Sequence, residues 1–197
     1  MNQKKHEVIF IENEHLYYHN GMRMPCVSDI LSHFGLINFS NVREDVLNAS
    51  LNFGRVVHET CRLYDLDALA GWDSEIDPYL EGWKKFRAEK NPIFRLIEEP
   101  LVSRVWSFAG TPDRTCSDSL LDIKTGQYSV AHQIQTALYK ILIEENYGIK
   151  IKTRMCVYLK PNNYKIVFHS DKKDISIAKS LISVFNWKRV NKVDMGA

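Results

Sequence analysis

The feature that most constrains the fold of this chain is a change in its hydrophobic pattern close to residue 93. Before that point apolar residues recur at helical spacing, which predicts helices over 41–69 and 76–90. After it, short apolar segments bounded by turn residues are typical of consecutive β-strands, and we expect these at 94–100, 101–108, 111–117 and 120–123.

The C-terminal part of the chain alternates helix and strand. Helical periodicity predicts one helix over 131–147, ended by Gly148, and another over 171–190. Between them, residues 152–160 and 164–169 are expected to pair as strands. The sequence therefore predicts an α/β (α+β) domain with a mixed central β-sheet flanked by helices.

The N-terminal segment is expected to form a β-hairpin from residues 8–11 and 15–19, with Asn20-Gly21 as a turn. Ser28 has a side chain suited to capping the N-terminus of a short helix over 29–34. These N-terminal elements precede the long helical segment and the strands of the central sheet.

The length of 197 residues suits a single domain. We expect residues 1–92 to supply the hairpin and a helical part, with a break at Gly54, and residues 93–197 to supply the sheet core and the C-terminal helix. Hydrophobic residues make up 45% and charged residues 25%, which excludes a disordered chain or a collagen-like repeat. Short apolar runs and an N-terminus without a secretory pattern predict a cytoplasmic protein without a membrane partner.

The cysteine spacing excludes a zinc ribbon. Cys26, Cys61, Cys116 and Cys156 are 35, 55 and 40 residues apart, so no CxxC pair can present two thiolates to one ion. Free, mostly buried thiols are expected, and a disulfide or a thiol catalyst are the alternatives.

Candidate chemistry concentrates between Asp113 and Lys124. Alternate side chains of a strand share a face, so Asp122 and Lys124 are expected to point the same way. A turn around residues 116–119 would bring Asp113, on the preceding strand, beside Asp122. Two carboxylates and one lysine at one spot form an oxygen-rich site suited to Mg²⁺ with a cation nearby.

Phosphodiester hydrolysis is the chemistry that uses such a set, because a metal ion neutralises phosphate and activates a bound water. The lysine can orient or deprotonate that water, or stabilise developing negative charge. A lone Asp-x-Lys triplet is common, however, and an exposed ion pair at a strand end is the simpler alternative for Asp122 and Lys124.

The order of the motifs around this triplet resembles the PD-(D/E)XK nuclease superfamily, specifically its RecB-like exonuclease branch with phage-encoded members. The opening Phe10-x4-His15-x-Tyr17 is similar to that of phage nucleases, although Cys26 departs from a usual Ser or Thr pattern. The motifs that carry the resemblance are, in chain order, Gly54-x3-His58, the acidic Glu99, Gly110-Thr111-Pro112-Asp113-Arg114, Asp122-Ile123-Lys124-Thr125-Gly126 and Gln135-x3-Tyr139.

The resemblance implies a restriction-endonuclease-like core and assigns roles to individual residues. Mg²⁺, with Mn²⁺ as a substitute, would be held by His58, Asp113, Asp122 and the carbonyl of Ile123. The implied catalytic residues are Lys124, Asp122, Asp113 and Glu99. Glu98 adjoins Glu99, so the strand register decides which of the two faces the site.

The resemblance also implies substrate contacts. Gln135 and Tyr139 lie one helical turn apart and would line the site. Arg114 and Thr125 would contact phosphate, although both are equally compatible with structural roles. Some members of the branch carry a four-iron cluster that needs three cysteines near the C-terminus; only Cys156 follows Tyr139 here, so no iron–sulfur cluster is expected.

The net charge of +2 conceals an uneven distribution. Residues 1–139 carry 14 basic and 19 acidic groups, whereas residues 140–197 carry 12 basic and 5 acidic groups. The basic part could follow a phosphate backbone or simply be a solvated surface. Candidate contacts are Lys150, Lys152, Arg154, Lys160, Lys165, Lys172 and Lys173. Aromatic residues that could stack on bases, or lie in the core or rim instead, are Trp72, Trp83, Trp106 and Tyr128.

The expected function is that of a metal-dependent DNA exonuclease acting on single strands or on duplex ends in phage or prophage DNA recombination, repair or turnover. A single-strand annealing or binding protein is a candidate partner. The alternatives are a structure-specific or nicking endonuclease at the same site, and a DNA-binding module without activity. The complete set of Asp113, Asp122 and Lys124 argues against the inactive module.

Overall fold

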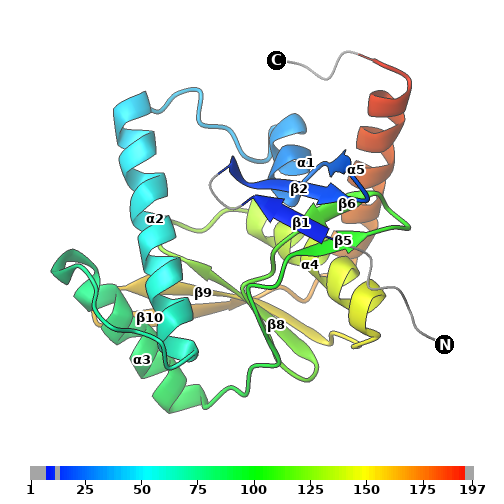
Figure 1. The fold of residues 1–197 in the computed structure, drawn as a ribbon. Helices are drawn as coiled ribbons and strands as arrows, with labels where there is room; N and C mark the ends of the chain where they lie inside the picture. Colours follow the sequence, from blue (N-terminus) through cyan, green and yellow to red (C-terminus); the bar gives the residue numbers. More distant parts are fainter. Residues whose placement is uncertain (1–7, 12–13, 194–197) are drawn as a thin grey trace.

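A central five-stranded mixed sheet organises the molecule (Figure 1). The structure, a computed structural model, describes residues 8–11 and 14–193. Strand order across the sheet is β10-β9-β8-β7-β4; β8 and β9 run parallel, and the other neighbours are antiparallel. The mixed sheet expected from the sequence is therefore confirmed. The strands are β4 (Leu96–Ile97), β7 (Arg114–Thr115), β8 (Ser119–Lys124), β9 (Thr153–Lys160) and β10 (Asn163–Phe168).

The parallel pair β8–β9 requires a crossover, and helix α4 (Ala131–Tyr147) supplies it. Its bounds are those predicted from periodicity. Gly148 ends the helix with a positive φ of 66°, a conformation that glycine adopts without steric cost.

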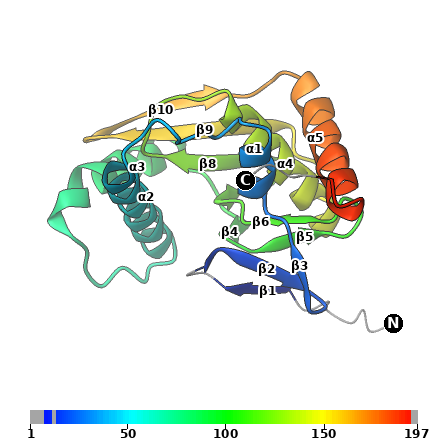
Figure 2. The same cartoon turned by 90° about the horizontal axis from the view of Figure 1, so that it is seen from above.

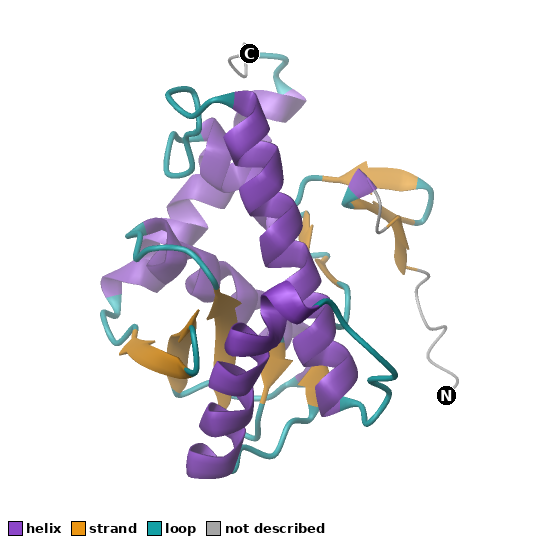
Figure 3. Cartoon of the chain, turned by 90° about the vertical axis from the view of Figure 1, so that its left-hand side faces the viewer, coloured by secondary structure: helices purple, strands orange, loops and turns teal. Residues whose placement is uncertain are grey.

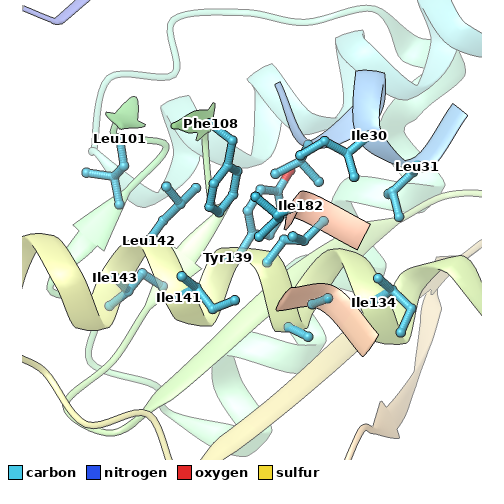
Figure 4. Close-up of a cluster of buried hydrophobic side chains, with 14 of the residues drawn as sticks. Ile30, Leu31, Leu101, Phe108, Ile134, Tyr139, Ile141, Leu142, Ile143 and Ile182 are labelled. Carbon is cyan, nitrogen blue, oxygen red and sulfur yellow. The ribbon is translucent and has the colours of Figure 1, made fainter. Parts of the chain in front are cut away.

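Alternation along β8 separates two hydrophobic layers on opposite faces of the sheet. Leu120 packs with α4, α1 (Val27–His33) and α5 (Lys173–Val190), in the cluster that Figure 4 shows around Leu142 and Phe108. Leu121 and Ile123 pack on the other side, against α2 (Glu44–Asp65) and α3 (Asp77–Lys90). Figure 2 shows α2 and α3 at one end of the view and α5 at the other. Asp122 and Lys124 share the parity of Leu120 and so belong to the α4 face.

Helix α2 runs unbroken through Gly54, so the predicted break there is wrong. The position lies against Thr125, whose Oγ1 would be 3.5 Å from a Cβ at Gly54, and tertiary packing keeps the helix continuous. Pro78 lies in the first turn of α3, where its missing N–H costs nothing, after the short 3-10 turn η2 (Ser74–Ile76).

The N-terminal strands form a separate three-stranded sheet rather than a lone hairpin. β1 (Val8–Ile11), β2 (Leu16–His19) and β3 (Met22–Met24) pair in order, and Figure 3 shows them to one side of the main sheet. Residues 12 and 13 of the expected hairpin loop lie outside the described residues.

The cap of helix α1 is Cys26, not Ser28 as expected. The Asp29 carboxylate accepts a 2.9 Å hydrogen bond from the Cys26 backbone N–H, and the helix begins at Val27, two residues earlier than expected. All four cysteines are free, and Cys26, Cys61 and Cys156 are buried.

The segment 101–108, expected as one strand, is a hairpin of β5 (Leu101–Ser103) and β6 (Phe108–Gly110). Its turn is held from α4, because the Glu145 carboxylate accepts hydrogen bonds from the N–H groups of Arg104 and Val105. No helix among the described residues has the length and hydropathy needed to cross a membrane.

Candidate functional site

The antiparallel pairing of β7 and β8 brings the two predicted carboxylates together. Arg114 pairs with Leu121, so the preceding Asp113 lies beside the end of β8 that carries Asp122. The Asp113 Oδ2 atom accepts a 2.6 Å hydrogen bond from the backbone N–H of Ile123, and Lys124 Nζ lies 2.7 Å from Asp122 Oδ2.

Helix α2 adds His58 to this group. His58 Nδ1 lies 3.5 Å from Asp113 Oδ2, and 27% of the His58 side chain is exposed. We call His58, Asp113, Asp122 and Lys124 the acidic–lysine cluster. The structure thus brings together residues from three elements that span more than 60 positions of the sequence.

The four charges of the cluster stabilise one another against burial. Burial alone would raise the pKa of Asp113, but His58 and Lys124 lower it to about 2. Burial raises the pKa of Asp122, opposed by Lys124. Burial opposes the charged forms of Lys124 and His58, yet neighbouring carboxylates raise both pKa values. Pairing therefore outweighs burial for Asp113, Lys124 and His58, and opposes it only in part for Asp122.

Tyr139 and Gln135 lie on the predicted shared face of α4. The Gln135 Nε2 group donates a 3.1 Å hydrogen bond to Tyr139 Oη. Burial and the charges of Asp122 and Asp113 raise the pKa of Tyr139, so its hydroxyl stays protonated beside the cluster. Gly110 is needed for this approach, since a Cβ there would lie 3.0 Å from Tyr139 Cε1.

Sequence reasoning missed other side chains near the cluster. Cys156 is the register partner of Asp122, and its thiol donates to Asp122 Oδ2 at 3.5 Å. Tyr17 is fully buried, and its hydroxyl lies 2.8 Å from Thr111 Oγ1. Cys156 lies beside Asp122 because of the register between β8 and β9. A local sequence pattern does not reveal the register between two strands. Tyr17 belonged to the N-terminal motif, but nothing in that motif linked it to Asp113.

His132 is a further residue of this region that the sequence did not single out. Its Nδ1 atom lies 2.6 Å from Tyr158 Oη. Burial and the nearby charge of Lys124 lower the pKa of His132 to about 4, so the ring is neutral at physiological pH.

The Arg114 side chain has internal partners, in keeping with the structural role that the sequence left open beside a phosphate contact. Its side chain is fully buried: Nε donates to Asp65 Oδ2 at 2.7 Å, and Nη1 donates to Glu98 Oε1 at 2.8 Å. Asp65 also accepts from Trp83 Nε1 and Arg87. We call Asp65, Glu98 and Arg114, with the outer Arg87, the buried ion network.

The backbone before β5 turns Glu98, not Glu99, towards these groups. Glu98 has a positive φ of 47°, and its N–H donates to the Asp113 carbonyl at 2.9 Å. Burial and the Asp113 charge raise the Glu98 pKa, opposed by Arg114. Glu99 is exposed and hydrogen-bonds to Tyr147 instead. Of the two glutamates between which the sequence left the choice open, Glu98 is therefore the one that contacts Arg114.

Thr125 extends from the end of β8 and lies against Gly54 of α2, close to the cluster. Among the basic residues expected to contact a phosphate backbone, Arg154 is corrected to a structural role. Its side chain is buried and forms a 2.7 Å ion pair with Asp174. Trp83 is fully buried in the core, whereas Trp72 and Tyr128 are exposed. The remaining candidates, all exposed, are Lys150, Lys152, Lys160, Lys165, Lys172 and Lys173.

The donor chemistry of the cluster suits a hard divalent cation. Asp113, Asp122 and the Ile123 carbonyl offer oxygen, and His58 offers nitrogen. Within residues 8–11 and 14–193, no three His, Cys, Asp or Glu side chains are already arranged to hold an ion. The carboxylates are instead paired with Lys124, His58 and the Ile123 N–H.

Comparison with known proteins gives limited information. No family profile and no curated protein matches the chain. Among solved structures, an alkaline exonuclease from Laribacter hongkongensis is similar over 86% of this chain and 89% of that chain, with 12% identity and a TM-score of 0.49. A protein named "Putative exonuclease" from Eubacterium rectale is similar over 72% of this chain and 67% of that chain, with 10% identity and a TM-score of 0.49.

Proposed function

We propose that this protein is a metal-dependent DNA exonuclease of the PD-(D/E)XK type, folded as one domain over residues 1–197. The observation that carries the proposal is the convergence of Asp113, Asp122 and Lys124, with His58, in one cluster at the end of β8. A decayed site would be expected to lack one of these groups.

Each member of the cluster has a distinct task in this proposal. Asp113 and Asp122 would hold Mg²⁺ or Mn²⁺ together with His58 and the Ile123 carbonyl. The ion would neutralise the phosphate and supply an activated water. Lys124 would orient that water or stabilise charge that develops on the phosphate oxygens. Glu98, rather than Glu99, would be the acidic residue that supports the site.

The contacts around the cluster support subsidiary roles. Gln135 and Tyr139 are linked to each other and would line the path of the substrate. Thr125, at the end of β8, would contact phosphate. The exposed lysines of residues 140–197 would follow the backbone of single-stranded DNA or of a duplex end. A phage setting in the cytoplasm of the host, and a single-strand annealing or binding protein as partner, complete the proposal.

End-labelled DNA tests the proposal. Single- and double-stranded oligonucleotides labelled at either end should be shortened from one end with Mg²⁺ or Mn²⁺, and EDTA should stop the reaction. The label that is released first reports polarity. No cleavage with either ion would contradict the proposal.

A covalently closed circular substrate separates the endonuclease alternative, which uses the same residues. An exonuclease leaves the circle intact, whereas a nicking or structure-specific endonuclease opens it. Tight DNA binding without cleavage of any substrate would instead support the inactive module.

A further inference from the structure

Three aromatic side chains extend from the acidic–lysine cluster towards solvent. Tyr158 of β9 is the register partner of Lys124 on the adjacent parallel strand, so both side chains lie on the face covered by α4. His132, in the first turn of α4, contacts the Tyr158 hydroxyl, with ring centroids 5.8 Å apart. Tyr128 follows, with its ring centroid 6.4 Å from that of Tyr158 and tilted by 45°.

Tyr128 is the outermost member of this row and the one that solvent reaches. Half of its surface, 51%, is exposed, while Tyr158 is only 4% exposed. The Tyr128 hydroxyl accepts a hydrogen bond from Gln133 Nε2. The ring is therefore held at its hydroxyl by α4 and along one side by Tyr158, with the remaining surface free.

The connection around Tyr128 leaves room for a ligand beside the cluster. Gly126 and Gln127 are exposed, and no atom of the described residues beyond Gly126 and its two chain neighbours lies within 4 Å of the position that a Cβ on Gly126 would take. This connection begins directly after Lys124 and Thr125. A phosphodiester held at Asp122 and Lys124 would therefore place its neighbouring nucleoside near the Tyr128 ring.

We propose that Tyr128 is a stacking platform for the nucleobase next to the phosphodiester that is cleaved. The inference rests on the proposed nuclease function and adds a substrate class to it: the cleaved strand presents an unpaired, unstacked base. An aromatic ring accepts any base, because every base has a π-face. A frayed or single-stranded end can supply such a base, and an intact duplex cannot.

The location of Tyr128 distinguishes it from the two exposed tryptophans, Trp72 and Trp187. Trp72 lies near Lys84 of α3, with the ammonium 5.5 Å from its ring. Trp187 lies near the C-terminal end of α5. Tyr128 is instead joined through Tyr158 to the strand position beside Lys124.

The test combines a protein change with a substrate change. Wild type, Tyr128→Leu and Tyr128→Phe are compared on a single-stranded 20-nucleotide DNA and on the same DNA with one abasic residue flanking the scissile bond. Trp187→Leu, on α5, serves as a control for loss of an exposed aromatic residue elsewhere. Thermal unfolding of each variant verifies that it is folded.

Tyr128→Leu should slow cleavage of the intact strand about 5- to 100-fold, the range for loss of one stacked base. Tyr128→Phe should stay within about 3-fold of wild type because the ring is retained, and Trp187→Leu should do so because the site is untouched. The abasic residue should slow wild type by a similar factor and add little to Tyr128→Leu, because both changes remove the same contact.

Two outcomes are decisive against the inference and distinguish its failure from that of the proposed function. If wild type cleaves, but Tyr128→Leu matches it or the two losses multiply, the platform is refuted and the nuclease assignment stands. If wild type cleaves no DNA with Mg²⁺ or Mn²⁺, the proposed function fails and the platform fails with it.

Discussion

Asp113 and Arg114 are neighbours in sequence, yet their side chains belong to two different charged groups. Asp113 joins the acidic–lysine cluster, where His58 retains 27% and Lys124 18% side-chain exposure. Arg114 joins the buried ion network and, like Asp65, is fully buried. Helix α2 contributes to both through His58 and Asp65, which lie seven residues apart and so share a face.

The two groups differ in composition and in the burial of their central residues, since Glu98 and the outer Arg87 of the buried ion network also retain 20% and 28% side-chain exposure. In the buried ion network Arg114 pairs with Asp65 and Glu98, although its Nη2 atom is buried without a hydrogen-bond partner among the described residues. Trp83 and Phe94 cover the Arg114 guanidinium. The cluster combines two carboxylates with a lysine and a histidine, and so brings oxygen and nitrogen donors together beside an ammonium group. Charge alone therefore does not identify a site in this molecule; a set of donors suited to a metal ion beside a lysine does.

The strongest way to test this contrast is to remove a carboxylate from the cluster. Asp122→Asn should reduce cleavage about 100-fold or more, because a neutral amide neither binds a divalent cation as well nor balances Lys124. Asp118→Asn is the matched control, since Asp118 lies on the turn between β7 and β8 and pairs with the exposed Lys152 at 3.2 Å. Single-turnover cleavage measures both, and equal rates would remove Asp122 from the site.

The corresponding change in the buried ion network should act on stability. Arg114→Ala leaves Asp65 and Glu98 without their shared cation and should lower the free energy of unfolding by about 3–5 kcal/mol. Arg114→Lys should recover only part of it, because an ammonium cannot make the two directed contacts of a guanidinium. Urea unfolding measures the effect. If an Arg114 variant were as stable as wild type but did not cleave DNA, Arg114 would contact the substrate and this account of the network would be wrong.

Replacing either of two helical glycines, Gly82 of α3 and Gly54 of α2, should change the stability less, and in opposite directions. In Gly82→Ala the new Cβ would meet the Asn163 carbonyl oxygen and lie 2.8 Å from that of Lys160, which should cost about 1–3 kcal/mol. Gly54→Ala meets only Thr125 Oγ1 at 3.5 Å and should stabilise α2 by up to about 1 kcal/mol. Thermal unfolding of both variants tests the continuous α2; destabilisation in Gly54→Ala would contradict it.

His169, which belongs to neither charged group, predicts how the stability of the protein depends on pH. Burial and Arg154 lower the pKa of His169 to about 4, against an ordinary value of 6.5. The unfolded chain therefore binds more protons than the folded one between these values. The contribution is complete above about pH 6.5 and is lost, by up to about 1.4 kcal/mol per pH unit, as the pH falls towards 4.

His169→Asn should accordingly flatten the decline of stability between pH 6.5 and pH 4. Urea midpoints across this range measure the slope. An unchanged slope would mean that His169 does not remain neutral in the folded protein.

Regular elements were predictable where the local pattern alone determines them. The helix Ala131–Tyr147 was predicted with correct ends, because apolar periodicity and Gly148 both mark it. The hairpin inside 101–108 was missed because its turn depends on the Glu145 carboxylate, about 40 residues away. The same limit applies to Gly54, whose helix continues through tertiary contacts.

The site was predictable where spacing along one strand was enough. Asp122 and Lys124 follow from alternation, and Asp113 follows from one turn. The exchange of Glu99 for Glu98 depends on a positive φ at a non-glycine residue, which sequence does not reveal. The position of Cys156 follows from strand register, and the burial of Arg114 depends on Asp65 of a distant helix.

The most direct test of the central claim is metal-dependent cleavage of end-labelled single-stranded DNA by Lys124→Ala. Lys84→Ala, on the outer surface of α3 beside Glu81, is the matched control. We expect Lys124→Ala to lose about 100- to 10,000-fold in the single-turnover rate with Mg²⁺ while remaining folded, and Lys84→Ala to match wild type. A folded Lys124→Ala protein that cleaves at the wild-type rate would contradict the assignment of the acidic–lysine cluster as the catalytic site.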